Sequence, residues 1–439
     1  MTNPIKAVIN IKRDELPFSL LMFSYFFLVI TTFWILKPLK KTLFIGFYKE
    51  VGGFDLFSWH MKGSQAELLA KVLNMVVAFL AVVVFTWLAR KFRRQQLTFV
   101  FSGFTMVCAL IFSFIINNPA GSTVWSFYLF GDLFNTLMVA TFFAFLNDSV
   151  TPDAAKRLYG LVVLGGVTGG AFGSTFVRVW TDRFAASSWM WICIVIAIVI
   201  AFVAMIAGKI VDRDRPKLKT EQASIPPVEK KSNVAIEGAK LVFKSPYLLA
   251  IVGIVGFYEI VSTVLDFQFT ATIEHFLDTK LAIGKQIATV YSITNIVAML
   301  VQLFFTSFIM TRFGVKTALF VLPLAILLSS CGFIAVPVIW IGCSLSISDN
   351  SLNYSVNQSS KEALYVPTSR DEKYKAKAFI DMFVHRFAKA LAVGVSLGIT
   401  AIFTEFSAIR WLSVFTLVIV ITWIFVARYA GNKFQEITT

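Results

Sequence analysis

Apolar residues along this chain form long blocks instead of the short runs that are typical of a soluble protein. A helix that crosses a bilayer needs about 20 mainly apolar residues, and the blocks reach that length. The pattern predicts twelve spans. We expect them at residues 18–47, 67–89, 97–116, 124–147, 158–179, 189–208, 247–270, 286–310, 316–336, 338–360, 379–402 and 408–427. The ninth and tenth are separated only by Pro337, which predicts a tight hairpin.

A polar stretch from Lys209 to Ser245 divides the spans into two sets of six. Its many basic residues and the Pro226–Pro227 pair are typical of a solvated linker. We therefore expect an N-terminal half over residues 1–208, a cytoplasmic linker over 209–246 and a C-terminal half over 247–439. Lys and Arg are concentrated in the loops on the same side as the N-terminus, which predicts that both termini are cytoplasmic.

The composition supports a membrane protein, because 57% of the residues are hydrophobic and 46 are Phe. A soluble domain has about 45–50% apolar residues. The net charge of +15 follows from the loop charges, so it does not indicate nucleic-acid binding. No small-residue cleavage site follows the first apolar segment, so we expect it to be retained in a multi-pass protein of a bacterial inner membrane. Four cysteines, Cys108, Cys193, Cys331 and Cys343, lie in apolar runs and are expected to be small buried hydrophobes.

Several charged residues lie inside the predicted spans, where a charge costs about 2.5–3.5 kcal/mol or more. Lys37, Lys40 and Lys41 share one face of the first span, with Pro38 between them. The alternative is a helix that ends at Leu36 with three lysines reaching the membrane surface. The apolar residues after Thr42 favour lysines that face a water-filled cavity.

Other spans also carry polar residues with helical spacing, and we take them as further candidates for substrate binding. These are Asp132 and Asn135 in the fourth span, Glu259 and Asp266 in the seventh, Asp349 and Asn353 in the tenth, and Arg386 and Lys389 in the eleventh. Asp381 lies four residues before His385 and can neutralise either His385 or Arg386. His385 by itself is more often a satisfied polar residue than a proton relay.

The two halves repeat one arrangement, because the segments 156–173 and 377–394 each run from basic residues into a glycine-bearing helix. Two parallel six-helix repeats are typical of the major facilitator architecture. Spans one, four, seven and ten line the central cavity of that architecture. In this chain the polar residues within spans lie in these four spans and in the eleventh. This pattern predicts a basic central cavity that attracts polyphosphates. Residues at the cytoplasmic junctions are candidates for gating: Lys156, Arg157, Lys375, Lys377 and Asp381.

Motifs of common enzymes and pumps are missing. The run Gly165-Gly-Val-Thr-Gly-Gly170 has no lysine to hold a phosphate, and three scattered histidines give no metal-ligand spacing. We therefore expect no enzyme activity, no cofactor and no metal, and a carrier that works as a monomer in the lipid bilayer on a small-molecule anion.

Two segments resemble conserved helix junctions of the nucleotide (ATP/ADP) translocases of plastids and intracellular bacteria. They are Asn147-Asp-Ser-Val-Thr-Pro-Asp-Ala-Ala-Lys-Arg-Leu-Tyr-Gly160 and the segment from Lys361 to Asp381. The run Lys37-Pro-Leu-Lys-Lys41 lies where that family has a charged motif in its first helix. The chain is identified as a divergent member of this family.

The resemblance implies that charged residues in helices one, four, seven and eleven are required for exchange. By position these are Lys40, Asp132 and Glu259, with either Lys377 or Lys389 as the last. The chain departs from the family in three ways. Lys41 replaces an acid, the fourth-helix acid is one methylene shorter, and no lysine-rich run follows Glu259.

Three functions remain open from the sequence. The first is a nucleotide transporter that works by alternating access, in which lysines bind phosphates and Phe33, Trp34 or Tyr258 flanks a base. The second is a carrier of another anion, such as a phosphorylated metabolite or phosphate. The third is a membrane receptor or scaffold with the same fold.

Overall fold

The computed structural model describes residues 12–13, 15–222, 234–369, 372–403 and 405–438. The chain forms two compact units. Unit 1 contains Met1–Gly53, Leu73–Val228 and Thr279–Asn295, and unit 2 contains Phe54–Val72, Glu229–Asp278 and Ile296–Thr439.

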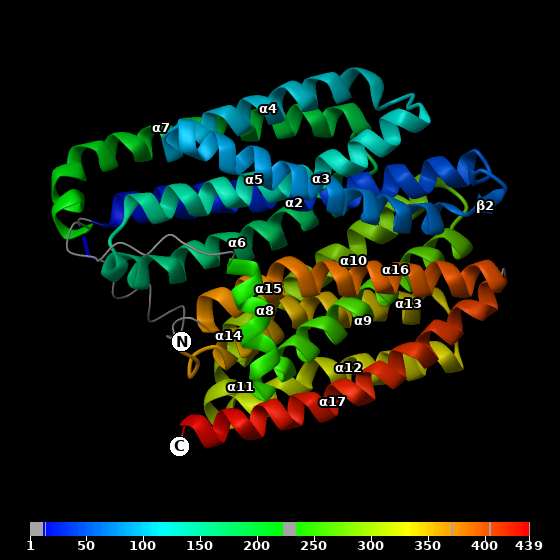
Figure 1. The fold of residues 1–439 in the computed structure, drawn as a ribbon. Helices are drawn as coiled ribbons and strands as arrows, with labels where there is room; N and C mark the ends of the chain where they lie inside the picture. The colour runs from blue at the N-terminus through cyan, green and yellow to red at the C-terminus, as the bar shows by residue number, and fades with distance from the viewer. Residues whose placement is uncertain (1–11, 14, 223–233, 370–371, 404, 439) are drawn as a thin grey trace. The chain divides into compact units, whose positions relative to one another are not determined.

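Most of unit 1 is α-helical (Figure 1). Its helices are α2 (Leu16–Glu50), most of α3 (Gly63–Lys91), α4 (Arg94–Ile115), α5 (Gly121–Ser149), α6 (Pro152–Trp180), α7 (Ala186–Gln222) and the first part of α10 (Lys280–Leu300). Helix α2 continues past Leu36 with Pro38 in its interior, as we expected from the apolar residues that follow. Helix α7 continues to Gln222, so the N-terminal part of the expected linker is helical.

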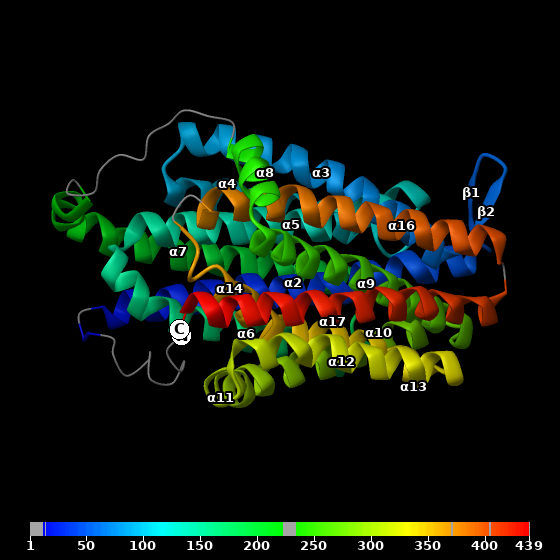
Figure 2. The same ribbon diagram turned by 60° about the horizontal axis from the view of Figure 1, so that its bottom comes forward.

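Unit 2 contains the remaining helices and a small hairpin. Its longer helices are α8 (Val234–Lys244), α9 (Pro246–Phe276), α12 (Gly314–Ala335), α13 (Ile339–Leu352), α16 (His385–Ile402) and α17 (Arg410–Thr438). Shorter elements are α11 (Ser307–Arg312), α14 (Gln358–Leu364), α15 (Lys377–Phe379) and the 3₁₀ turn η5 (Phe406–Ile409). Helices α12 and α17 lie side by side (Figure 2). The core contains Ile251 and Ile254 of α9, Leu322 of α12 and Trp423 of α17.

Four π-helical segments interrupt the described helices of unit 2. They are η1 (Val301–Thr306), η2 (Asn353–Asn357), η3 (Glu372–Ala376) and η4 (Ile380–Val384). The helical path is nevertheless continuous from Ile339 to Leu364, which at 1.5 Å per residue is about 39 Å long. This path is longer than the roughly 30 Å hydrocarbon core of a bilayer.

Ten of the described helices are long and apolar enough to cross a membrane. The tenth and eleventh expected spans are not among them, because η2 divides the tenth and because α16 begins with polar residues, including Arg386 and Lys389. Many large apolar side chains outside the cores are exposed, such as Trp87, Phe202 and Phe425, as lipid-facing positions require.

Local sequence explains how α6 and α9 begin. Thr151 caps α6 by accepting a hydrogen bond from the Ala154 amide, and Ser245 caps α9 in the same way from Leu248. A proline follows each cap at the first helical position, where its missing N–H has no intrahelical partner to lose. The repeated Thr-Pro and Ser-Pro pairs therefore fix where two membrane helices start.

A two-stranded antiparallel sheet follows α2, and the sequence pattern did not predict it. Strands β1 (Phe54–Leu56) and β2 (Trp59–Met61) are only three residues each. Gly52 and Gly53 enter the hairpin with positive φ angles of 88° and 137°, which residues other than glycine rarely adopt.

Glycines on one face of α6 let it pack closely against α2. A Cβ atom added at Gly165, Gly169 or Gly173 would lie 2.5–2.7 Å from a backbone oxygen of α2. The glycines of the fifth expected span therefore allow close helix packing. In the eleventh expected span, by contrast, a Cβ at Gly394 or Gly398 meets no described atom within 4 Å.

The cysteine expectation holds only in part. Cys193 and Cys343 are buried, but Cys108 is half-buried and Cys331 is exposed. Cys331 lies on α12, an apolar span, where an exposed small apolar side chain is compatible with lipid.

Replacing Gly169 by Ala should lower the thermal unfolding midpoint of the purified protein markedly. The new methyl would lie 2.5 Å from the Phe27 carbonyl oxygen, so the two backbones must separate, at a cost of about 1–3 kcal/mol. Gly398→Ala is the matched control, since open space there and a better helix propensity should leave the midpoint unchanged or raise it. Equal effects of the two substitutions would contradict the packing described here.

Candidate substrate-binding clusters

In unit 1, Lys40 lies at the centre of a small polar cluster between helices α2, α3 and α5. Its side chain is 6% exposed, and its ammonium group forms an ion pair with Asp132. The second carboxylate oxygen of Asp132 accepts a hydrogen bond of 2.9 Å from Asn74. The ammonium also lies 4.3 Å from the centre of the Tyr128 ring. Gly131 makes room for the Lys40 stem, because a Cβ there would lie 2.9 Å from Lys40 Cδ.

Lys37 lies one turn earlier on α2 and is surrounded by aromatic rings. Its nitrogen is 4.4 Å from the Trp34 ring centre, 5.0 Å from Tyr291 and 5.7 Å from Phe33. Such cation–π contacts stabilise a desolvated ammonium group by about 2 kcal/mol or more. Lys41 is 2% exposed. The three lysines therefore lie within unit 1 and among its side chains, as a membrane interior requires.

In unit 2, α9 carries two acids that each meet a basic side chain from another helix. Glu259 accepts from His385 at 2.8 Å, and the charges of Lys361 and Lys389 also act on the Glu259 carboxylate. Lys361 is 8% exposed, with its nitrogen 5.3 Å from the centre of the Tyr258 ring. His385 thus pairs with Glu259; the side chain of Asp381, the partner considered from sequence, lies outside the described part of the chain.

Asp266, two turns after Glu259, forms an ion pair with Lys71 from the start of α3. Asp349 on α13 is 1% exposed and accepts a hydrogen bond of 2.6 Å from Ser262 on α9. The seventh and tenth spans are therefore joined through buried polar groups, and both candidate acids of α9 have basic partners within unit 2.

The remaining candidates lie in α5, η2 and α16. Asn135 is half-buried one turn after Asp132. Asn353 begins the π segment η2 and accepts a hydrogen bond of 2.9 Å from Asn357. Arg386 and Lys389 are half-buried near the start of α16.

Ion pairs also occur at the junctions proposed for gating. Arg157 at the start of α6 holds the Glu15 carboxylate with two hydrogen bonds. In unit 2, Lys375 pairs with Glu237 at 2.9 Å and Lys377 with Glu362 at 2.5 Å. The side chain of Lys156 lies outside the described part of the chain, so its gating role stays a prediction.

Several residues of these clusters were missed by sequence reasoning. Lys71 lies inside the second expected span, so the same rule that identified Lys40 should have identified it. Asn74, Tyr128 and Ser262 gave no such signal, because a neutral polar or aromatic side chain is common in membrane helices. Among the described residues, no group of His, Cys, Asp or Glu is placed to hold a metal ion.

The helical architecture and the charge pairs inside its membrane spans are those of a membrane carrier. The model of the Major Facilitator Superfamily matches residues 21–362, and the chain belongs to this superfamily. The model of the TLC ATP/ADP transporter matches residues 334–434. The predicted resemblance to nucleotide translocases is thus confirmed.

Similar curated proteins carry related names at low identity. ADP,ATP carrier protein 1 of Chlamydia muridarum is 23% identical over 71% of this chain and 65% of its own length. A chloroplastic ADP,ATP carrier protein 1 of Arabidopsis thaliana is 22% identical over 72% of this chain and 55% of its own length. The chain thus covers about two thirds of the chlamydial relative and about half of the plant one.

Solved structures share the fold. The nucleoside transporter NupG is 12% identical to this chain, with a TM-score of 0.57. The match covers 98% of this chain and 100% of the NupG chain. The POT family transporter PepTSo is 12% identical to this chain, with a TM-score of 0.62. The match covers 93% of this chain and 98% of the PepTSo chain. At this identity the likeness confirms the major facilitator fold predicted from the sequence.

Replacing Glu15 by Gln should lower the unfolding midpoint by roughly 1–2 °C at pH 7. The Arg157 guanidinium holds the pKa of the Glu15 carboxyl below its usual value of 4.5. The stabilisation is therefore complete well above pH 4.5 and is lost as the pH falls through the lowered pKa. Melting curves between pH 7 and pH 3.5 should converge for the variant and the unmodified protein. Glu50→Gln, at the opposite end of α2, should show no such convergence.

Proposed function

We propose that this protein is a nucleotide transporter that exchanges or takes up ATP- or ADP-like molecules by alternating access. The observation that carries the proposal is the group of three lysines on one face of α2. Lys37 and Lys40 lie against aromatic rings, and Lys40 also forms an ion pair with Asp132 inside a membrane span. The match to the ATP/ADP transporter model and the names of the relatives support a nucleotide as the cargo.

The arrangement around Lys40 explains how such a site accommodates a polyphosphate. An ammonium group has three N–H donors and forms its strongest hydrogen bonds with charged oxygens. Asp132 balances the charge of the ammonium and holds it in place while no substrate is bound. Phosphate oxygens then bring further negative charge, and the aromatic rings beside Lys37 offer flat surfaces against which a base can stack. Asn135, Glu259, Asp266, Asp349, Asn353, Arg386 and Lys389 remain proposed substrate-binding residues.

The same proposal includes the placement of the chain in a bacterial inner membrane with both termini in the cytoplasm. The distribution of Lys and Arg among the loops supports this orientation. The ion pairs of Arg157, Lys375 and Lys377 then lie at the cytoplasmic ends of their helices, where they would open and close during transport. We propose that the carrier works as a monomer and as a transporter, not as an enzyme.

Transport should be measured with the full chain reconstituted into liposomes. We expect saturable uptake of radiolabelled ATP or ADP, faster when the liposomes contain unlabelled nucleotide. A competition panel of nucleotides, phosphorylated metabolites and phosphate identifies the cargo. If phosphorylated metabolites compete and nucleotides do not, the protein carries another anion. If a folded, reconstituted protein transports none of these anions, the proposal is wrong and a receptor role gains weight.

Lys40→Gln should weaken the binding of ATP by about tenfold and that of AMP or phosphate by less, because a polyphosphate offers the ammonium more oxygens. Lys40→Gln alone leaves Asp132 without its cation, so the double variant Lys40→Gln/Asp132→Asn is measured beside it. Lys62→Gln, at an exposed lysine outside the spans, is the control. Equal losses for ATP and phosphate would mean that Lys40 has a structural role only.

A further inference from the structure

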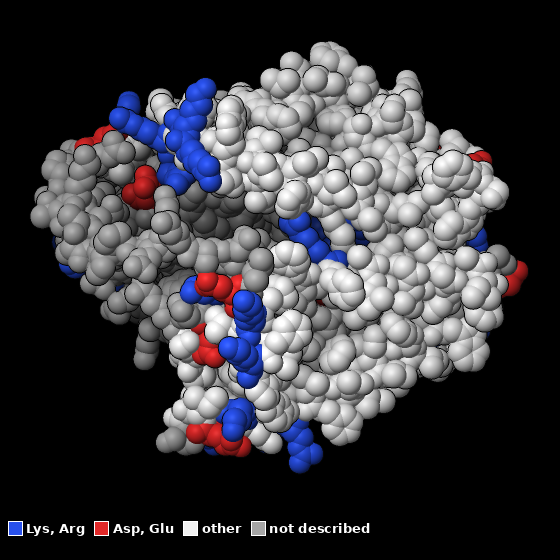
Figure 3. All heavy atoms as spheres, viewed as in Figure 1, with Lys and Arg blue, Asp and Glu red and all other residues white. Residues whose placement is uncertain are grey.

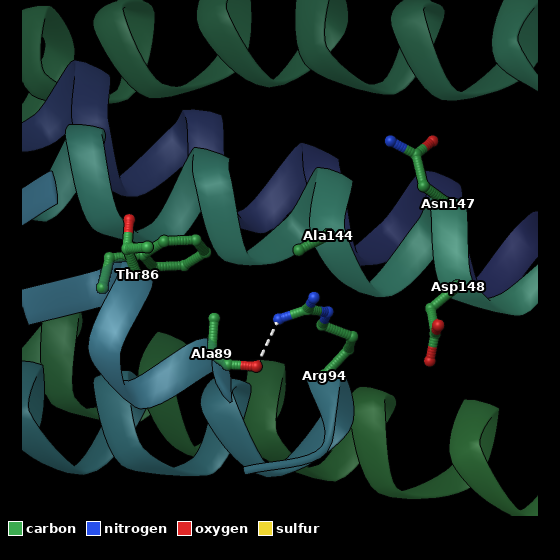
Figure 4. Close-up of a pocket in the computed structure, with 7 residues that line it drawn as sticks. Thr86, Ala89, Arg94, Ala144, Asn147 and Asp148 are labelled. Carbon is green, nitrogen blue, oxygen red and sulfur yellow. Dashed lines mark hydrogen bonds between the residues drawn. The ribbon is translucent and has the colours of Figure 1, made fainter. Parts of the chain in front are cut away.

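The hairpin after α2 and a group of basic residues lie at opposite ends of α3. The helix runs for 29 residues from Gly63 to Lys91, which at 1.5 Å per residue is about 43 Å. Basic side chains gather over the junction of α3 and α4 (Figure 3), where Arg94 donates a hydrogen bond of 2.8 Å to the Ala89 carbonyl oxygen (Figure 4). The hydrocarbon core of a bilayer is about 30 Å thick, so the hairpin lies near the other membrane surface.

The two strands of the hairpin lie along that surface. They run across the direction of α17, which is a candidate membrane span (Figure 2). Three residues separate Glu50 at the end of α2 from Phe54, and one residue separates Met61 from Gly63 at the start of α3. These short connections keep both strands close to the ends of the spans, at the level of the lipid headgroups.

Contacts within unit 2 hold the hairpin in place. Met61 is fully buried, and Trp59 packs against the apolar cluster formed mainly by α9 and α16. Both oxygens of the Glu274 carboxylate accept hydrogen bonds, one of 2.7 Å from the Gly63 amide and one of 2.9 Å from the Ser64 amide. The loop at the tip of the hairpin therefore has a fixed base.

Phe57 at the tip has an unfavourable backbone conformation. Leu56 pairs with Trp59, so the loop between the strands consists of Phe57 and Ser58. The φ angle of Phe57 is 54°, in the left-handed region where short hairpin loops usually have glycine or asparagine. Because the Phe57 side chain is 98% exposed, packing among the described residues does not offset this cost. An apolar partner outside the chain can offset it.

We propose that the hairpin tip inserts into the interfacial layer of the bilayer, with the Phe57 ring among the upper acyl groups of the lipids. Residues 56–59 carry no charge, so their insertion does not bury a charge. Asp55 and His60 are paired across the strands at 2.7 Å and stay among the headgroups as the polar face of the hairpin. Amphipathic elements bury Trp, Phe and Leu side chains about 5–10 Å deep at this boundary.

This anchor acts on the start of α3. That helix carries Lys71 and Asn74, which hold Asp266 and Asp132 in their polar clusters. Insertion of the tip therefore helps to keep the polar side chains of α3 at a fixed depth in the membrane.

Photocrosslinking of the full chain in liposomes identifies what the tip contacts. The photoreactive residue p-benzoylphenylalanine replaces Phe57 in one variant and Asp55, on the polar face of the same hairpin, in the control. The liposomes contain phosphatidylethanolamine and phosphatidylglycerol, and the mass of the hairpin peptide is measured after illumination. We expect phospholipid adducts at position 57 in about tenfold higher yield than at position 55. Equal lipid yields, no adduct, or a crosslinked dimer at position 57 would overturn the proposal.

A nitroxide spin label measures the depth of the tip independently. It is attached to Phe57→Cys or to Asp55→Cys in a protein with Cys108→Ser and Cys331→Ser, since those two cysteines are not buried. We expect the label at position 57 to collide mainly with lipid-soluble oxygen, and the label at position 55 mainly with a water-soluble nickel chelate. If position 57 meets the chelate as often as position 55 does, the tip lies in water and the lipid assignment is wrong.

Discussion

The cost of placing charge in hydrocarbon governs how each unit of this protein is built. A buried ammonium or carboxylate is tolerated only when opposite charge, hydrogen bonds or aromatic faces replace the water that it has lost. Lys40 has Asp132 and Tyr128, Asp266 has Lys71, and Glu259 has His385. Each pair forms within its own unit. The cationic face of α2 is therefore stable in the membrane before any anionic substrate arrives.

Close helix packing supports that face. Gly165, Gly169 and Gly173 bring α6 against the backbone of α2 between Phe23 and Thr31, so the helix that carries the lysines has a close neighbour in the turns before them (Figure 1). Asn74 of α3 and Asp132 of α5 then fix the lysine side chain from the other side. Backbone contact thus sets the position of α2, and polar side chains set the position of the Lys40 ammonium group.

The sequence predicted the architecture well because hydrophobic blocks of span length have few alternatives. It also identified most charged residues of the clusters, since each is costly in its span. It could not give their partners. Asp381 was considered as a partner for His385 by its spacing of four residues, which is one turn of an α-helix. Asp381 lies inside the π segment η4 (Ile380–Val384), where a turn needs an additional residue, so the α-helical spacing does not apply. The hairpin after α2 was missed because strands of three residues leave no periodic signal.

The π segments have a geometric consequence for the eleventh span. A π turn contains one residue more than an α turn, so it displaces every later side chain around the helix by about 100°. His385, Arg386 and Lys389 all follow η4. If the position of the π turn shifts along the helix, the side chains that it passes rotate to a different helix face. Both ends of the helix stay in place. A rotation of cationic groups in the membrane then needs neither unfolding nor a sliding helix.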